Sequence, residues 1–351
     1  MTDMTETLTP PADAARSAGE TLLEVTDLAV EFRSDDGAVR AVDGLSYRVE
    51  AGRTLALVGE SGCGKSVSSL AVMGLLPPTA HVVGGTARYR GTDLLALSPT
   101  QHRAHCGTHV AMVFQDALAA LNPVHTVGYQ LTESLRARTG TSRRDARRRA
   151  IELLDLVKVP NAAQRVDEYP HQFSGGMRQR VMIASALALD PDVLIADEPT
   201  TALDVTVQAQ VLRLLAEIQA ERQMGLVLIT HDLGVVAGVA DDVTVMYAGR
   251  AVEQAPVRDL YAAPAHPYTR ALLRSVPRIG VAEDRTTGGR LPVVPGRPPA
   301  PGRVPPGCSF HPRCELAQDV CRTDEPPLAE VAPGRSSACH FAAELLGGAR
   351  A

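Results

Sequence analysis

The residues from Gly59 to Ser66 read GESGCGKS and fit the phosphate-binding pattern G-x-x-x-x-G-K-[ST]. Glycines at these spacings let successive backbone N–H groups point at one anion. The pattern predicts a nucleoside triphosphate site, with Lys65 at the β- and γ-phosphates and the Ser66 hydroxyl on Mg²⁺. A glycine-rich turn that merely carries a lysine is the alternative. The predicted binding residues of this loop, called the P-loop below, are Gly59, Glu60, Ser61, Gly62, Cys63, Gly64, Lys65 and Ser66.

Two adjacent acids, Asp197 and Glu198, directly follow the apolar run Val193–Ala196. An aspartate at the end of a buried strand can hold Mg²⁺ through the waters of the metal. The neighbouring glutamate can polarise a water for in-line attack on a γ-phosphate. Paired acids at a strand end can also be plain surface charge, but beside a P-loop they predict a hydrolytic site.

A second anion-binding helix start is predicted at Phe173–Met177, which reads FSGGM. The backbone N–H groups of Gly175 and Gly176 and the Ser174 hydroxyl are the donors there. One chain does not need two cradles for one γ-phosphate. We therefore expect the second cradle to serve the ATP of a neighbouring chain, so that two chains stacked head to tail enclose two nucleotides.

Gln115 and His231 each follow a run of residues with the pattern of a buried strand. In a parallel sheet the ends of such strands line the ligand crevice. We expect His231 to bond the γ-phosphate and to hold Glu198 and the attacking water in place. Phe32 is predicted to lie against the nucleotide base, with an ordinary core or edge-strand phenylalanine as the alternative.

These residues require a scaffold of strands and helices. Thr54–Val58 is an apolar run of strand length before the P-loop, and Val67–Leu76 is a predicted helix after it. Leu22–Glu50 alternates around a turn-rich SDDG, which is typical of a β-hairpin. Apolar strands alternating with helices predict a mainly parallel sheet covered on both faces, an α/β fold. The remaining predicted strands and helices are His109–Phe114, Ser142–Val157, Pro170–Leu189, Val193–Ala196, Val205–Arg222, Gly225–Thr230 and Asp242–Tyr247.

Composition narrows the function classes. The chain has 351 residues, a net charge of −5 and no tryptophan, so neither a basic nor an aromatic nucleic-acid surface is expected. We expect the arginines of Ser142–Val157 to form a solvated face. No apolar run approaches the length of a membrane span, and residues 1–20 lack the apolar core of a signal peptide. We expect a disordered leader there, and a cytoplasmic protein or one held at the cytoplasmic face of the membrane by partners.

Together these motifs resemble the ATP-binding cassette (ABC) family, over Leu22 to Pro277. GESGCGKS is similar to its Walker A motif, FSGGMRQR to its signature and VLIADEP to its Walker B motif. The signature departs from the common LSGGQ at both ends but keeps the serine and glycines. The resemblance implies an ABC nucleotide-binding domain, with an antiparallel β subdomain and a helical subdomain at about 116–185. It also implies an active ATPase, with Glu198, His231 and Gln115 as catalytic residues, Ser66, Gln115 and Asp197 as Mg²⁺ ligands, and Asp204 as the D-loop aspartate.

The segment from His266, HPYTRALLRSVPR, and the later GCSFHPRC resemble the C-terminal extension of oligopeptide and dipeptide importer ATPases. That subfamily usually has Asp-Pro where this chain has Asp116-Ala117. The resemblance implies two integral-membrane permease subunits, a second ABC ATPase (another copy or a homologue) and an extracytoplasmic peptide-binding protein, with the chain peripheral on the cytoplasmic face. Nickel or another small solute is the alternative cargo. A soluble ABC ATPase acting on nucleic acid or ribosomes is a further alternative, although such proteins usually carry two cassettes or a long insertion.

The tail contains a group of cysteines with the spacing C-x5-C-x6-C-x17-C, namely Cys308, Cys314, Cys321 and Cys339. In a cytosolic chain such a group favours a metal over disulfides. The family resemblance implies a [4Fe–4S] cluster, with Zn²⁺ or reduced or oxidised thiols as alternatives. We expect an ATPase domain at 21–277, followed by a Pro-rich linker and a Cys-rich module at 278–351.

Overall fold

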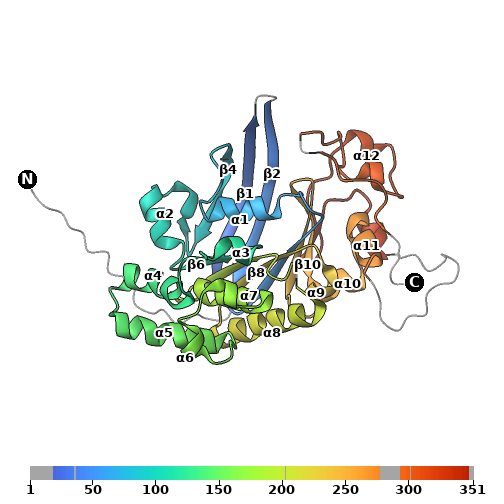
Figure 1. Cartoon of the computed structure of the whole chain (residues 1–351). Coiled ribbons are helices and arrows are strands. Elements are labelled where there is room, and N and C mark those ends of the chain that lie inside the picture. Colours follow the sequence, from blue (N-terminus) through green and yellow to red (C-terminus); the bar gives the residue numbers. More distant parts are fainter. Residues whose placement is uncertain (1–18, 35–36, 202, 277–292, 301, 348–351) are drawn as a thin grey trace, which may run out of the picture.

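The computed structural model describes residues 19–34, 37–201, 203–276, 293–300 and 302–347. The predicted leader and the first part of the predicted linker lie outside these residues, apart from 19–20. The described strands form two sheets (Figure 1). The central sheet has eight strands in the order β11 (Ala329–Ala332), β12 (Arg335–Ser337), β10 (Arg250–Pro256), β9 (Asp242–Tyr247), β3 (Thr54–Val58), β8 (Gly225–Thr230), β7 (Val193–Asp197) and β6 (Val110–Val113). The second sheet has the order β2 (Gly37–Glu50), β1 (Thr21–Ser34), β4 (Ala80–Tyr89) and β5 (Thr92–Asp93).

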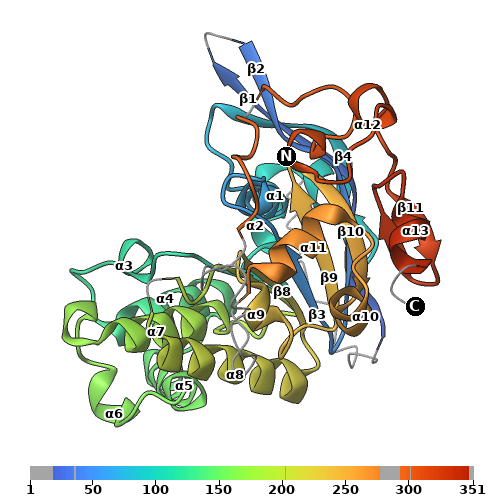
Figure 2. The same ribbon diagram turned by 90° about the vertical axis from the view of Figure 1, so that its right-hand side faces the viewer.

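Some of the described α-helices lie against the sheets, and the others form a separate helical group. The first helices are α1 (Lys65–Val72), α2 (Pro99–His105), α3 (Ala117–Ala120), α4 (Val127–Thr139), α5 (Arg143–Leu156), α6 (Ala162–Arg165) and α7 (Gly175–Ala186). The later ones are α8 (Val205–Arg222), α9 (Leu233–Val236), α10 (Val257–Ala262), α11 (Pro267–Arg274), α12 (Val320–Thr323) and α13 (Ala342–Gly347). Helices α4 to α7 gather away from the β1–β2 hairpin, whereas α10 and α11 lie along β9 and β10 (Figures 1 and 2).

The parallel strands β3, β8, β7 and β6 of the central sheet are buried on both faces, which explains their continuous apolar sequences. Leu194 and Ala196 of β7 pack into the cluster under α7 and α8. Val193 and Ile195 point to the opposite face, where they meet the second sheet and α1. Strands β9, β3, β8, β7 and β6 run parallel to one another, as the sequence predicts, whereas β10 pairs antiparallel with β9.

Most predicted elements are confirmed with small shifts of their ends. The hairpin over Leu22–Glu50 is the antiparallel pair β1–β2. The helix predicted at Val67–Leu76 instead begins at Lys65 and ends at Val72. Its start is earlier because Gly64 takes a left-handed conformation (φ 103°) at the N-cap, so the helix begins inside the P-loop motif itself.

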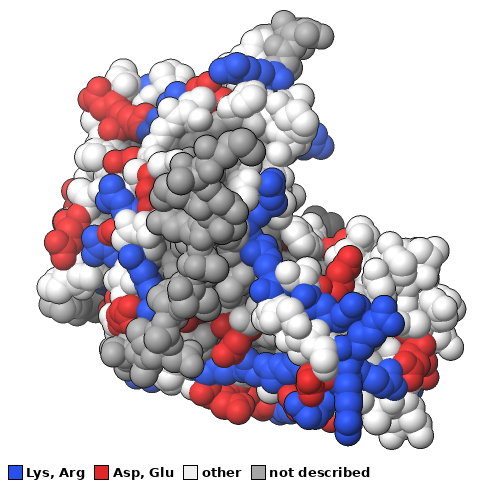
Figure 3. All heavy atoms as spheres, turned by 90° about the vertical axis from the view of Figure 1, so that its left-hand side faces the viewer, with Lys and Arg blue, Asp and Glu red and all other residues white. Residues whose placement is uncertain are grey.

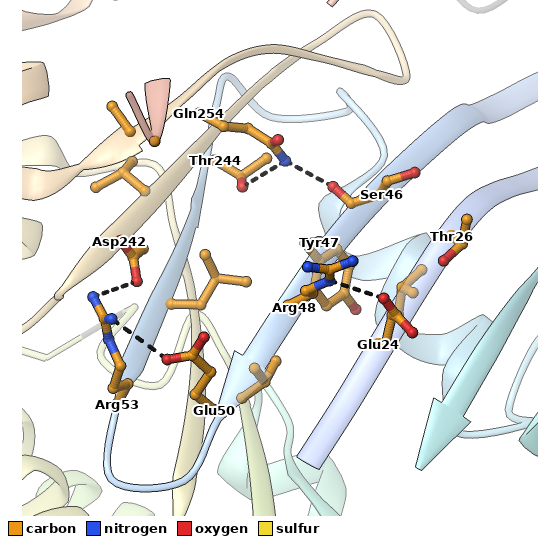
Figure 4. A pocket seen from close by; sticks show the side chains of 16 residues that line it. Glu24, Thr26, Ser46, Tyr47, Arg48, Glu50, Arg53, Asp242, Thr244 and Gln254 are labelled. Atoms are coloured by element: carbon orange, nitrogen blue, oxygen red, sulfur yellow. Dashed lines mark hydrogen bonds and ion pairs between the residues drawn. The ribbon is translucent and has the colours of Figure 1, made fainter. Parts of the chain in front are cut away.

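The second sheet is joined to the central sheet by polar contacts around a cavity of about 420 Å³ (Figure 4). The Gln254 side-chain amide donates to the backbone carbonyl of Ser46 at 2.7 Å and to the Thr244 hydroxyl at 3.2 Å. Arg53 pairs with Asp242 at 2.8 Å and with Glu50 at 3.4 Å. These contacts fix the hairpin beside the strand that leads into the P-loop.

Arginines of α5 form ion pairs with acidic side chains of the same helical region. Figure 3 shows Lys and Arg gathered on the lower part of the face that carries α5 in Figure 1. Arg147 forms a two-pronged pair with Asp167 at 2.5 and 2.6 Å, and Arg148 pairs with Asp145 at 3.1 Å. Exposed pairs of this kind contribute little stability, on the order of 0 to 1 kcal/mol.

The tail adds strands to the central sheet, which the sequence does not predict. Strand β12 pairs antiparallel with β10, joining Glu253 to Ser337, and β11 pairs with β12. The Ser337 hydroxyl donates to the backbone carbonyl of Ala265 at 3.0 Å. The pairing covers what would otherwise be an open edge at β10.

His266 anchors the start of α11 and gives the fold a pH-dependent stability. Its Nδ1 accepts from the backbone N–H of Tyr268 at 3.1 Å, and its side chain is buried. Burial lowers the pKa of His266 from 6.5 to about 4. Because the unfolded chain takes up this proton first, stability is lost as the pH falls from 6.5 toward 4.

We predict that His266 alone removes about 2 kcal/mol of unfolding free energy between pH 7 and pH 5. Urea unfolding at both pH values measures the loss. His266→Asn keeps a side-chain acceptor at the N-cap but does not titrate in this range, so its pH-dependent loss should be smaller by about that amount. An equal loss in both proteins would contradict the prediction.

Candidate nucleotide site

The P-loop connects β3 to α1, and its close packing explains its glycines. A Cβ added at Gly59 would lie 2.3 Å from the backbone oxygen of Met246. A Cβ at Gly64 would lie 2.5 Å from the backbone oxygen of Ala41, at a φ of +103°. Both positions therefore require glycine for space, and Gly64 also requires it for backbone conformation.

We predict that Gly64→Ala lowers the unfolding free energy by about 2 kcal/mol or more, because it combines left-handed strain with a backbone clash. Thermal unfolding measures the change. Gly62→Ala is the matched control, since Gly62 has φ +81° but a Cβ added there would meet open space. Equal destabilisation by both substitutions would show that the contact with Ala41 has no effect.

The Lys65 ammonium lies at the centre of the loop. Lys65 is 4% exposed, and its Nζ donates to the backbone oxygens of Gly59 at 2.7 Å and Glu60 at 3.0 Å. The Cys63 thiol is buried 3.6 Å from the same Nζ, and burial raises the pKa of Cys63. The Lys65 ammonium in this position is suited to binding an anion on the loop.

Ser66 and Asp197 meet beside the loop. The Ser66 hydroxyl donates to Asp197 Oδ1 at 2.9 Å, across 131 positions in the chain. Asp197 is 6% exposed, and burial raises its pKa while the Ser66 hydrogen bond opposes the rise. A hydroxyl and a carboxylate are oxygen ligands of the kind that Mg²⁺ takes, so the donor set fits that ion.

Glu198 contacts three other side chains at the site. Its Oε2 accepts from the Gln115 amide at 3.0 Å and from the Thr201 hydroxyl at 2.8 Å, and its Oε1 lies 3.2 Å from His231 Nδ1. Burial alone raises the pKa of Glu198, but hydrogen bonds from Thr201 and His231 and the charge of Lys65 outweigh it and lower the pKa. Glu198 also has a φ of +44°, which is costly for a residue with a side chain.

Lys65, Ser66, Gln115, Glu198 and His231 line one cavity of about 460 Å³, whereas Asp197 is not among its lining residues. Gln115, Glu198 and His231 come from the ends of the adjacent strands β6, β7 and β8, as the strand-end argument predicts. The lining residues are Ala41, Glu60, Ser61, Gly62, Gly64, Lys65, Ser66, Val67, Gln115, Glu198, His231 and Leu272.

Other predicted site residues lie elsewhere. Ser174 caps α7, where its hydroxyl accepts from the backbone N–H of Met177 at 3.4 Å, and Ser174 and Gly175 are exposed. Gly176 faces α8, since a Cβ there would lie 2.6 Å from Val207 Cγ1. Asp204 caps α8 through the backbone N–H of Val207 at 3.0 Å.

Phe32 also lies apart from the residues that line the cavity. It is in β1, opposite Val39 and Ala80, and packs against the core between the two sheets. Phe32 is only partly buried there, and its contact with the nucleotide base stays a prediction.

The prediction of an iron–sulfur or zinc site at the tail cysteines is wrong. In the described residues, which include Cys308, Cys314, Cys321 and Cys339, no group of three or more His, Cys, Asp or Glu side chains is arranged to hold a metal ion. Burial raises the pKa of Cys308, Cys314 and Cys339, the last to about 11. Cys308 and Cys314 pack against the cluster that contains Phe310, as small apolar side chains do.

Comparison with known proteins settles the family. Residues 42–201 match the ABC transporter family, and residues 252–321 match the oligopeptide/dipeptide transporter C-terminal region. The chain is 50% identical over 318 residues to a putative peptide import ATP-binding protein of Brucella abortus, covering 91% of this chain and 94% of that protein. This chain belongs to the ABC transporter ATPases. It is also 49% identical over 321 residues to the dipeptide transport ATP-binding protein DppD of Escherichia coli, covering 91% and 96% of the two chains.

Solved structures confirm the ABC cassette fold. The dimeric bacterial ABC transporter cassette MJ0796 superposes with a TM-score of 0.61 at 23% identity, covering 68% of this chain and 99% of that one. CbiO1 of Clostridium perfringens superposes with a TM-score of 0.59 at 26% identity, covering 69% and 91%. In the described part of this ABC ATPase, every helix is too short or too polar to cross a lipid bilayer.

Three residues at this site are not assigned a role from the sequence. Thr201 donates to Glu198, Leu272 of α11 lines the cavity, and the Tyr268 hydroxyl accepts from the backbone N–H of Glu60 at 3.0 Å. Thr201 lies three positions after Glu198, a spacing that suggests a local contact. Nothing local places Tyr268 beside the P-loop, because 208 positions separate it from Glu60.

Proposed function

We propose that this ABC ATPase powers the import of oligopeptides or dipeptides through separate permease subunits. The observation that carries the proposal is the 49–50% identity to peptide and dipeptide transport ATP-binding proteins over 91% of the chain. The match of the C-terminal region to the oligopeptide/dipeptide transporter family supports the same proposal. We assign the ATPase domain to residues 21–277, with the helical subdomain at about 116–185, and the C-terminal module to 278–351.

In the proposed mechanism the P-loop N–H groups and Lys65 hold the ATP phosphates. Glu198, ionised at neutral pH because its pKa is low, orients the attacking water in line with the γ-phosphate. Gln115 and Thr201 fix one oxygen of Glu198, and His231 contacts the other. From that position His231 would bond the γ-phosphate of bound ATP. Ser66, Asp197 and Gln115 would hold Mg²⁺, which would neutralise part of the phosphate charge.

Closure by a second ABC ATPase completes the proposed site. Ser174 and Gly175 are exposed at the start of α7, outside the cavity that holds Lys65. We propose that they donate to the γ-phosphate of ATP bound by the partner ATPase, with Gly176 allowing the close packing of α7 on α8 and Asp204 at the shared interface. Phe32 is retained as the proposed contact of the base.

The permease contact is proposed at the segment after Gln115. Apolar side chains in that segment are exposed, Val124 by 71% and Tyr129 by 45%, and Phe114 just before it is 38% exposed. Such side chains suit a docking helix of a membrane protein. We therefore place the chain peripherally on the cytoplasmic face of the membrane, with two permease subunits and an extracytoplasmic peptide-binding protein as partners.

The test is to purify the tagged chain from detergent-extracted membranes, identify the proteins that accompany it, and reconstitute the complex in vesicles. We expect two integral-membrane permeases and ATP-dependent uptake of labelled di- or oligopeptides. Uptake of Ni²⁺ without peptide uptake, or recovery of ribosomes or nucleic acid in place of permeases, would contradict the proposal.

A further inference from the structure

The C-terminal segment contacts the P-loop through a buried ion pair. Arg313 Nη1 donates to Glu60 Oε2 at 2.6 Å, and Arg313 Nη2 donates to Glu60 Oε1 at 2.9 Å, across 253 positions in the chain. The Arg313 side chain is 5% exposed and the Glu60 side chain 26%. A two-pronged arginine–carboxylate pair in this setting is both directional and strong.

Arg313 is itself firmly placed. Its Nε donates to the backbone oxygen of Pro295 at 2.7 Å, and Nη1 also reaches the Tyr247 hydroxyl at 3.3 Å. Its guanidinium lies 5.7 Å from the ring centre of Tyr247 and 5.9 Å from that of Phe310. These contacts fix the position and direction of the guanidinium toward Glu60.

The backbone of Glu60 is held by the same part of the fold. Its N–H donates to the hydroxyl of Tyr268, a fully buried side chain in α11. The Tyr268 ring lies 4.7 Å from Tyr247 and 5.3 Å from Phe310, centre to centre. An aromatic cluster shared by the ATPase core and the tail therefore supports both contacts to Glu60.

Glu60 carries a negative charge at the rim of a site for a polyanion. It lines the cavity with Lys65, and its backbone oxygen accepts from Lys65 Nζ. Without a partner this carboxylate would repel phosphates bound in the cavity that it lines. Arg313 supplies the compensating charge.

We propose that Arg313 is a positioning residue for ATP binding: it neutralises Glu60 and thereby lets the C-terminal segment set the nucleotide affinity of the P-loop. This proposal depends on the ATPase activity of the family and not on the transported solute. Loss of peptide transport with normal ATP binding would therefore leave it standing.

The test compares variants of the purified full-length chain by titration with a fluorescent ATP analogue and by steady-state ATPase rates. Arg313→Gln leaves Glu60 uncompensated, and we expect it to weaken ATP binding about tenfold or more, with a smaller change in kcat. Arg313→Lys keeps the positive charge but loses the two parallel hydrogen bonds of the guanidinium. Its ATP affinity should therefore lie between those of the wild type and of Arg313→Gln. Glu60→Gln keeps an acceptor for Arg313 but removes the negative charge, so it should bind ATP more tightly than the wild type.

The double variant Glu60→Gln/Arg313→Gln should bind ATP more tightly than Arg313→Gln alone, because no unpaired carboxylate remains. Arg335→Gln is the matched control: Arg335 bonds the backbone oxygen of Ala263 and lies 3.8 Å from Glu253, away from the P-loop. It should lower the melting temperature but leave ATP affinity at the wild-type value. The proposal is overturned if Glu60→Gln weakens ATP binding tenfold, or if Arg335→Gln weakens it as much as Arg313→Gln.

Discussion

Replacing Glu198 with glutamine should reduce ATP turnover about 100-fold or more while ATP binding is retained. The amide keeps the size of the side chain and can still contact Thr201 and His231, but it cannot act as an ionised acceptor toward the attacking water. Phosphate release and equilibrium binding of labelled ATP, measured on the same preparation, give the two quantities. Loss of binding together with turnover would mean that Glu198 serves mainly to hold the loop.

Glu221→Gln is a suitable control, because Glu221 is an exposed glutamate on α8 away from the cavity. It should leave both ATP binding and turnover at wild-type values. Wild-type turnover in Glu198→Gln would remove Glu198 from its proposed role.

Lys65→Met should weaken ATP binding about 100-fold or more, and this is the second large effect that we expect. Methionine retains the length of the buried stem but removes the ammonium, which lies 4% exposed at the centre of the P-loop. Two charge-assisted hydrogen bonds to phosphate are lost, each on the order of 1.5 to 3 kcal/mol in such settings. Isothermal titration with ATP and Mg²⁺ measures the loss.

Lys158→Met provides the comparison for this variant. Lys158 pairs with Glu217 on the surface and is remote from the P-loop cavity. Its ATP affinity should match the wild type. If Lys65→Met bound ATP normally and lost only turnover, the lysine would act on the transition state rather than on the bound nucleotide.

The sequence predicted those parts of the site that depend on local pattern. The strand before the P-loop, Thr54–Val58, is observed with the same ends, because a short apolar run between turn signals has few alternatives in a doubly covered sheet. The meeting of Gln115, Glu198 and His231 followed from the rule that parallel strand ends share one edge, and β6, β7 and β8 are indeed neighbours.

Long-range contacts could not be read from the sequence in the same way. Arg313 and Glu60 are 253 positions apart, and neither residue has a local partner that signals the pair. Strand β12 has only three residues and gains its place by pairing with the edge of β10. The tail cysteines misled the prediction because spacing along the chain does not fix how the side chains are arranged in space, and the described residues contain no group of three or more that could hold a metal ion.

The mechanism requires a second ABC ATPase to complete the nucleotide site, and a structure of the Glu198→Gln complex trapped with ATP and Mg²⁺ decides whether it does. We expect two stacked cassettes, with Ser174 of this chain within hydrogen-bonding distance of the γ-phosphate held by the partner. A monomer that hydrolyses ATP at the full rate, with Ser174 far from any nucleotide in the trapped complex, would contradict it.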